Sequence, residues 1–193
     1  TITYNGNGTS WEVADINPGG IDSIRYPVVI GTRTYFEATD GINGEELWAY
    51  ESTNDSAWMV ADINNAGSNS EPTSLLTVGT RIFFMADDGT HGDELWTHET
   101  TNDSTWMVAD LRSGFNNGSN AIPSAAIGTR LFFTADDDIH GRELWAHEMT
   151  NDSTWMVADI NNGSGDSYAG SNGIAVGSRF YFNANNGNSS SSH

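Results

Sequence analysis

The feature that most constrains this chain is a stretch of eighteen residues that occurs three times with few changes. It reads ELWAYESTNDSAWMVADI at 46–63, ELWTHETTNDSTWMVADL at 94–111 and ELWAHEMTNDSTWMVADI at 143–160. A partial fourth copy, WEVAD, begins at Trp11. Such repetition predicts that each unit is one supersecondary element, which buries its apolar surface against the neighbouring units.

Two landmarks set the length of the repeated unit. The tryptophan of the WxVAD segment recurs at intervals of 47, 48 and 49 residues, as Trp11, Trp58, Trp106 and Trp155. A Gly-(Thr/Ser)-Arg tripeptide recurs in step with it and contributes Arg33, Arg81, Arg130 and Arg179. The chain is therefore expected to consist of units of this size from end to end.

Each unit contains four short runs that are typical of β-strands. In the second unit they span 74–78, 81–87, 94–99 and 105–110, and turns rich in Gly, Asn, Asp and Ser separate them. No segment has a sustained helical period. Runs such as RIFFMA are apolar on both faces and need cover above and below. Four-stranded antiparallel sheets stacked around an axis supply that cover, so the sequence predicts an all-β fold, a four-bladed β-propeller of four-stranded antiparallel blades.

The units do not begin at the first residue. Residues 170–187 carry only the first two strands of a unit, and residues 1–15 carry only the last two. Blade 1 is therefore expected at 27–62, blade 2 at 73–110, blade 3 at 122–159, and blade 4 from 170–187 plus 1–15, closed by the N-terminal strands in a velcro arrangement. We favour closure within one monomeric chain. A homo-oligomer or a filament, in which a neighbouring chain completes the split blade, is the alternative. Residues 188–193 are expected to form a disordered or tag-derived tail.

The charge and composition narrow the range of partners. The chain of 193 residues has a net charge of −19, and all seven of its basic residues are arginine. Such a surface repels nucleic-acid backbones and anionic membranes. No apolar run approaches the roughly 20 residues of a membrane helix, so no membrane insertion is expected. The absence of cysteine excludes disulfides, iron–sulfur clusters and thiol catalysis.

Several recurring residues are expected to build the repeat. The repeated arginine and the recurring acids predict one arginine–carboxylate pair in each blade, with a charged ring around an anion as the alternative. The recurring tryptophans are expected to pack between blades. The acids at these positions are Asp15, Asp62, Asp110 and Asp159, together with Glu46, Glu94 and Glu143.

The turn between the second and third strands is rich in carboxylates. Aspartates beside glycine can coordinate calcium, although the spacing does not match a twelve-residue calcium loop, and a tight turn is the alternative that we favour. His91 and His140 align with Asn43, which argues against a zinc ligand. We expect no cofactor, with calcium as the one possible ion. The candidate calcium ligands are Asp40, Asp87, Asp88, Asp136 and Asp137.

The loops that leave the fourth strand vary most from unit to unit. Variable loops gather on one rim of a propeller, where ligands bind. Tyr26, Phe115 and Tyr168 lie in these loops among Asn, Ser and Gly, a composition that suits hydroxyl-rich ligands such as glycans. Solvated loops without a ligand are the alternative. Glycosylation sequons, used only if the host exports and glycosylates the protein, start at Asn7, Asn54, Asn102, Asn117, Asn151, Asn162 and Asn188.

The repeated unit resembles the ELWxxDGT repeat of bacterial and marine-type extracellular proteins. A typical member contains ANDGxHGEELWxxDGTxxGTxLVKDINPG, beside which this chain has ADDGTHGDELWTHETTNDSTWMVADL and, at 13–19, VADINPG. It departs from the pattern where DGT is replaced by Glu51-Ser52-Thr53 and its equivalents. The resemblance implies an extracellular or cell-surface propeller of a family with no assigned catalytic activity. We therefore expect a non-enzymatic module that binds a glycan or a protein, or that mediates adhesion. The alternatives are a self-assembling structural protein and a hydrolytic or lyase propeller.

Overall fold

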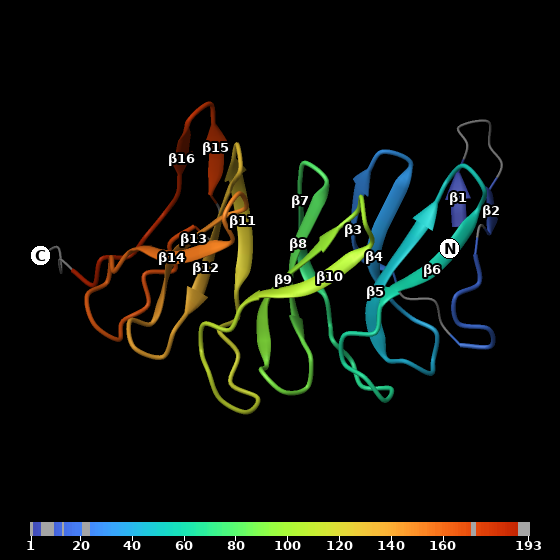
Figure 1. Cartoon of the computed structure of the whole chain (residues 1–193), viewed down its shortest axis with the longest axis horizontal. Helices are drawn as coiled ribbons and strands as arrows, with labels where there is room; N and C mark the ends of the chain where they lie inside the picture. Colours follow the sequence, from blue (N-terminus) through green and yellow to red (C-terminus); the bar gives the residue numbers. More distant parts are fainter. Residues whose placement is uncertain (1, 5–9, 13, 21–23, 171–172, 189–193) are drawn as a thin grey trace, which may run out of the picture.

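The chain folds into a row of antiparallel β-sheets (Figure 1). The computed structural model describes every residue except 1, 5–9, 13, 21–23, 171–172 and 189–193. The described part contains 16 strands and no helix, and thus no helix long and apolar enough to cross a membrane. The predicted sequon at Asn7 and the tail from 189 onward lie outside the described residues, as does the side chain of Trp11.

Three complete blades form the middle of the row. Each is a four-stranded sheet whose strands pair in chain order, as predicted. The first blade comprises β3 (Arg25–Ile30), β4 (Arg33–Thr39), β5 (Glu45–Glu51) and β6 (Ser56–Ala61). The second comprises β7 (Thr73–Val78), β8 (Arg81–Asp87), β9 (Asp93–Glu99) and β10 (Ser104–Ala109). The third comprises β11 (Ile122–Ile127), β12 (Arg130–Asp136), β13 (Arg142–Glu148) and β14 (Ser153–Ala158).

Two half-blades lie at the ends of the row. The N-terminal one pairs β1 (Ile2–Tyr4) with β2 (Ser10–Glu12), and the C-terminal one pairs β15 (Ile174–Val176) with β16 (Arg179–Tyr181). They form separate two-stranded sheets, on opposite sides of the three complete blades (Figure 1). The predicted fourth blade is therefore not assembled within this chain, because the whole row separates its two halves.

The hydrophobic core lies between successive blades. Along β8, the alternation of a strand sends Ile82 and Phe84 toward the first blade and Phe83 toward the third, and all three side chains are fully buried. This explains why the second strand of each unit is apolar on both faces. The partners of Ile82 and Phe84 include Tyr35, Leu47 and Ala49, and those of Phe83 include Leu131, Phe133 and Ala135.

The turns follow from residues that tolerate a left-handed backbone. Gly79, at φ 63°, makes the tight turn between β7 and β8, and Gly31, Gly128 and Gly177 repeat it. Asp103, at φ 53°, plays the same part in the turn between β9 and β10. Strands three and four of each complete blade also share a bulge, at Met107/Ala109 in the second blade. A bulge increases the local twist, which helps a blade to follow a curved stack.

Candidate functional site

The turns gather on two opposite rims of the row. On the upper rim of Figure 1, the turn between strands one and two is bonded to the turn between strands three and four; for example, the Thr100 amide donates to the Thr80 carbonyl at 3.0 Å. On the lower rim, the turn between strands two and three contacts the loop that leads to the next blade. There the Asn116 amide donates to the Thr90 carbonyl at 2.8 Å. The lower rim therefore carries the variable loops that follow the fourth strand of each unit, where a ligand was predicted.

The aspartates proposed as calcium ligands organise the lower turns. In the second blade, Asp88 Oδ1 accepts the amides of Thr90 and His91, both at 2.9 Å, and its Oδ2 lies 2.8 Å from His91 Nδ1. Asp137 and His140 repeat this arrangement, as do Asp40 and Asn43. These bonds engage both oxygens of Asp40, Asp88 and Asp137 in the hydrogen bonding of a tight turn. No group of three or more His, Asp and Glu in the described part of the chain is placed to hold a metal.

The hydrogen bond between Asp88 and His91 shifts the pKa of both side chains. The hydrogen bond to Asp88 raises the pKa of His91, which is thus charged to a higher pH than a free imidazole. Burial works to raise the pKa of Asp88, but the hydrogen bonds from His91 outweigh it and leave that pKa below its usual range. His140 and Asp137 show the same pair of shifts. The ion pair in this turn is therefore present over a pH range that extends above the pKa of a free imidazole and below that of a free aspartate.

Exposed apolar side chains mark the lower rim. Ile42 in the first blade and Ile139 in the third occupy the same turn position, and they are 77% and 67% exposed. In the second blade this position is Thr90, which is not apolar. The neighbouring loop supplies Phe115, which is 84% exposed and precedes Asn116, the residue whose amide donates to the Thr90 carbonyl. Each complete blade thus presents one apolar tip. Phe115 is one of the ligand-binding residues predicted from the sequence; the two isoleucines are not, although their shared turn position was a readable signal.

The other two predicted aromatic residues do not extend this pattern. Tyr26, at φ 53°, lies in β3, and Tyr168, at φ 51°, lies in the loop before β15. Both are about half exposed, at 48% and 55%. A hydrogen bond to Asp166 raises the pKa of Tyr168. Because Tyr26, Phe115 and Tyr168 occupy three different positions in the repeat, they do not form one repeated aromatic platform.

Successive blades are joined by a buried carboxylate. Glu94, fully buried on β9, accepts the amide of Ser119 at 2.8 Å and its hydroxyl at 2.5 Å, just before the first strand of the third blade. The first and third blades repeat this contact with Glu46 and Ser70, and with Glu143 and Ser167. We call the three pairs the Glu–Ser latches. Burial raises the pKa of Glu94 to about 6, against the hydrogen bonds that favour its charged form.

The arginine–carboxylate pair occurs in the three complete blades, but its acid differs from the predicted ones. Arg33, Arg81 and Arg130 lie 3.4, 3.2 and 3.5 Å from Glu51, Glu99 and Glu148 at the end of strand three. Among the described residues, the predicted acids Asp15, Asp62, Asp110 and Asp159 form no ion pair with arginine. The predicted Glu46, Glu94 and Glu143 belong to the latches instead.

The same arginines cover the recurring tryptophans. The guanidinium carbons of Arg33, Arg81 and Arg130 lie 5.5, 5.3 and 5.2 Å from the ring centres of Trp58, Trp106 and Trp155. These tryptophans are half-buried, with one face occupied by the cation. The predicted role of Trp as an interior residue between blades is filled more fully by Trp48 and Trp145, at 8% and 9% exposed.

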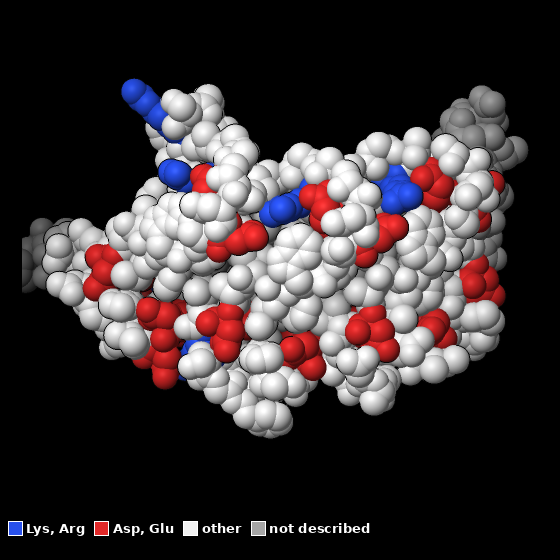
Figure 2. Space-filling model, in the orientation of Figure 1, with Lys and Arg blue, Asp and Glu red and all other residues white. Residues whose placement is uncertain are grey.

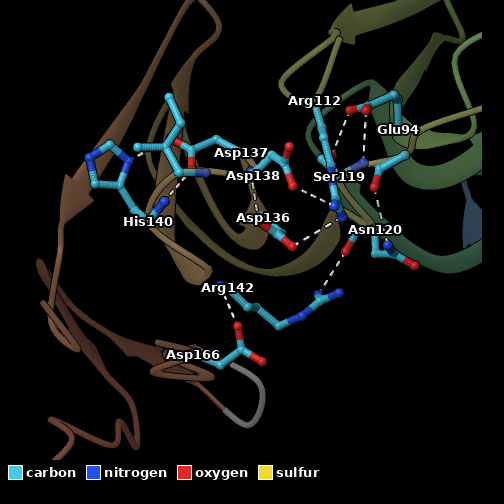
Figure 3. A network of polar contacts seen from close by, with 12 residues as sticks. Glu94, Arg112, Ser119, Asn120, Asp136, Asp137, Asp138, His140, Arg142 and Asp166 are labelled. Atoms are coloured by element: carbon cyan, nitrogen blue, oxygen red, sulfur yellow. Dashed lines mark hydrogen bonds and ion pairs between the residues drawn. The ribbon is translucent and has the colours of Figure 1, made fainter. Parts of the chain in front are cut away.

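Three of the other four arginines, Arg25, Arg112 and Arg142, make further polar contacts. Arg112 reaches Asp136 at 3.2 Å and Asp138 at 2.6 Å, and Arg142 donates to the Asn120 carbonyl at 2.8 Å (Figure 3). Arg25 lies 2.9 Å from the buried Glu37. Acidic side chains nevertheless dominate this edge of the molecule (Figure 2). The lower rim is therefore unsuited to a polyanionic ligand.

The sequons fall on both rims. Asn54, Asn102 and Asn151 are exposed in the upper turns between strands three and four, where Asn54 Oδ1 accepts the Ser56 hydroxyl at 2.7 Å. Asn162 is exposed in a lower loop, and Asn117 is half-buried there. A glycan on the three upper asparagines would leave the lower rim open.

Comparison with known proteins shows the fold but no family. No family model and no curated protein matches the chain, so the resemblance to the ELWxxDGT repeat rests on its motifs alone. TolB from Acinetobacter baumannii, a β-propeller protein, superposes with a TM-score of 0.51 at 10% identity, over 71% of this chain and 32% of TolB. Two weaker matches each have a TM-score of 0.43. A putative TolB from Agrobacterium tumefaciens is 7% identical over 68% of this chain and 44% of its own. Oligopeptidase B from Leishmania major is 12% identical over 79% of this chain and 22% of its own. The chain thus spans about a third of the length of the first of these proteins, and it has a propeller-type all-β architecture.

Proposed function

We propose that this chain is a non-enzymatic, extracellular binding module that holds a neutral glycan on its lower rim. The observation that carries the proposal is the apolar tip on each complete blade, formed by Ile42, Phe115 and Ile139, which are 77%, 84% and 67% exposed. Side chains so exposed contribute little to folding, so their occurrence on three successive blades favours a role in recognition.

The chemistry of the rim favours a neutral, hydroxyl-rich ligand. Apolar tips can cover the C–H faces of sugar rings, while side-chain amides such as that of the exposed Asn162 can bond to hydroxyl groups. Sulfated or sialylated glycans would meet a chain with a net charge of −19. Tips on successive blades allow several weak contacts to add along one extended ligand.

A binding experiment with matched variants tests this proposal. The chain would first be screened against neutral and anionic glycans, and the best ligand titrated by calorimetry. We expect Phe115→Ala to weaken binding by about tenfold or more, because a large exposed anchor is removed without disturbing the core.

The control is Val29→Ala, which truncates a side chain that is 62% exposed on strand β3, outside the lower loops. It should leave the affinity unchanged. Binding to no neutral glycan, or an equal loss from the Val29 and Phe115 variants, would refute the proposal.

A further inference from the structure

The two half-blades are the complementary parts of one blade. In β15–β16, Val176 pairs with Arg179, as Val78 pairs with Arg81 in the complete second blade, so this hairpin provides strands one and two. In β1–β2, Thr3 pairs with Trp11, as Thr97 pairs with Trp106, so that hairpin provides strands three and four. Together they supply each strand of a blade once.

The unpaired edges of β16 and β1 are the two edges that would pair with each other in a complete blade. In every complete blade, strands two and three pair along seven residue positions, from Arg81↔Glu99 to Asp87↔Asp93 in the second blade. Within the described part of the chain, β16 pairs only with β15, and β1 only with β2. An open edge with free amides and carbonyls is a template for a strand from another chain.

The side chains of the C-terminal half-blade lack their usual cover. Tyr181 is 52% exposed and Phe182 is 39% exposed, whereas the equivalent Phe83 and Phe84 are fully buried. On the adjacent strand, Ile174 and Val176 are 62% and 56% exposed. This apolar surface gives association a driving force, since covering it removes aromatic and aliphatic area from water.

The two partners of the repeated arginine–tryptophan contact are also divided between the two half-blades. In the three complete blades, the arginine that opens strand two lies within 5.5 Å of the tryptophan ring on strand four. The fourth arginine, Arg179, is exposed and has no ion pair or ring contact within the described structure. The fourth tryptophan, Trp11, belongs to β2 at the far end of the row (Figure 1).

We propose that a second copy of this chain completes the split blade, with its β1–β2 hairpin pairing onto β16 of the first copy. Because the two hairpins flank a row of three complete blades, the contact is head-to-tail, and two copies that exchange both hairpins close an eight-bladed ring. The register of the complete blades places Thr3 of the second copy opposite Tyr181, and Trp11 of the second copy beneath Arg179.

The solution mass of the full chain is the first test. Light scattering over a wide range of concentration should give twice the 20.8 kDa mass of one chain, or a higher multiple. Added salt should strengthen the association, because each copy carries a net charge of −19. A constant mass of 20.8 kDa at every concentration and salt level would overturn the proposal.

Cross-linking of full-length variants locates the contact. The chain has no cysteine, so a Thr3→Cys chain mixed with a Tyr181→Cys chain has no competing thiol. Opposed residues of antiparallel strands have Cα atoms about 4.5–5.5 Å apart, within the range of a disulfide. Mild oxidation should therefore join the two variants into a covalent dimer.

The control replaces Tyr181→Cys by Ile42→Cys, a residue that is 77% exposed on the lower rim and away from the contact. This mixture should cross-link poorly. Equal cross-linking in both mixtures would overturn the proposal, because it would show random collision. A chain that carries both Thr3→Cys and Tyr181→Cys and forms the disulfide only within one copy would overturn it too, because the blade would then close within the monomer.

Discussion

The Glu–Ser latch between the second and third blades makes a prediction about stability and pH. Glu94 is fully buried, and burial raises the pKa of its carboxyl from 4.5 to about 6. The folded state therefore favours the protonated acid. The stabilising contribution is complete below pH 4.5 and is lost as the pH rises through about 6.

The size of the effect follows from the two pKa values. Their difference is 6 − 4.5, or about 1.5, and each pKa unit corresponds to about 1.4 kcal/mol, so the contribution is about 2 kcal/mol. Gln at this position does not titrate. The free energy of unfolding of the native chain minus that of Glu94→Gln should therefore fall by about 2 kcal/mol between about pH 4 and pH 7.

Urea unfolding followed by tryptophan fluorescence, at several pH values, measures this difference. Glu99→Gln is the control on the same strand. Hydrogen bonds from Thr101, Thr80 and Arg81 outweigh the effect of burial and lower the pKa of Glu99, so its contribution is present at neutral pH and is lost on acidification. The two difference curves should slope in opposite directions. A flat curve for Glu94→Gln, or one that rises with pH, would refute the reasoning.

Three further predictions test other parts of the fold. Burial lowers the pKa of His98, so the contribution of His98 to stability is present above the pKa of a free imidazole and is lost on acidification. The variant His98→Tyr copies Tyr50 of the first blade and should remove this acid sensitivity, as measured by thermal melts at several pH values. Gly44→Ala should prevent stable folding, because a Cβ at Gly44 would lie 2.0 Å from the Ser68 carbonyl oxygen. In the control Gly31→Ala the new Cβ would have no atom within 4 Å, and urea unfolding should show a loss of only about 1 kcal/mol in the free energy of unfolding. Trp106→Ala should cost about 2–4 kcal/mol in the same assay, because the ring is half-buried and carries the Arg81 guanidinium; a loss below about 1 kcal/mol would show that the contact contributes little.

The sequence alone determined the local architecture. Periodic glycines and strand-forming runs predicted four strands per unit, and the structure confirms this in three blades. The phase of the repeat also identified the two half-units at the ends of the chain. These features depend on short-range patterns, such as a residue that tolerates the left-handed backbone of a turn, and such patterns can be read without knowledge of the fold.

Only the tertiary structure decided which repeated side chains meet. Glu94 contacts Ser119, 25 residues away in the next blade, while Arg81 takes Glu99 rather than Asp110. Both choices depend on strand register and on which face of a strand a side chain occupies, and a shift of one residue reverses that face. The sequence could not place the half-blades either, because it allowed closure within one chain or between chains. Their separation by the row of complete blades is a property of how the blades stack, which no single repeat contains.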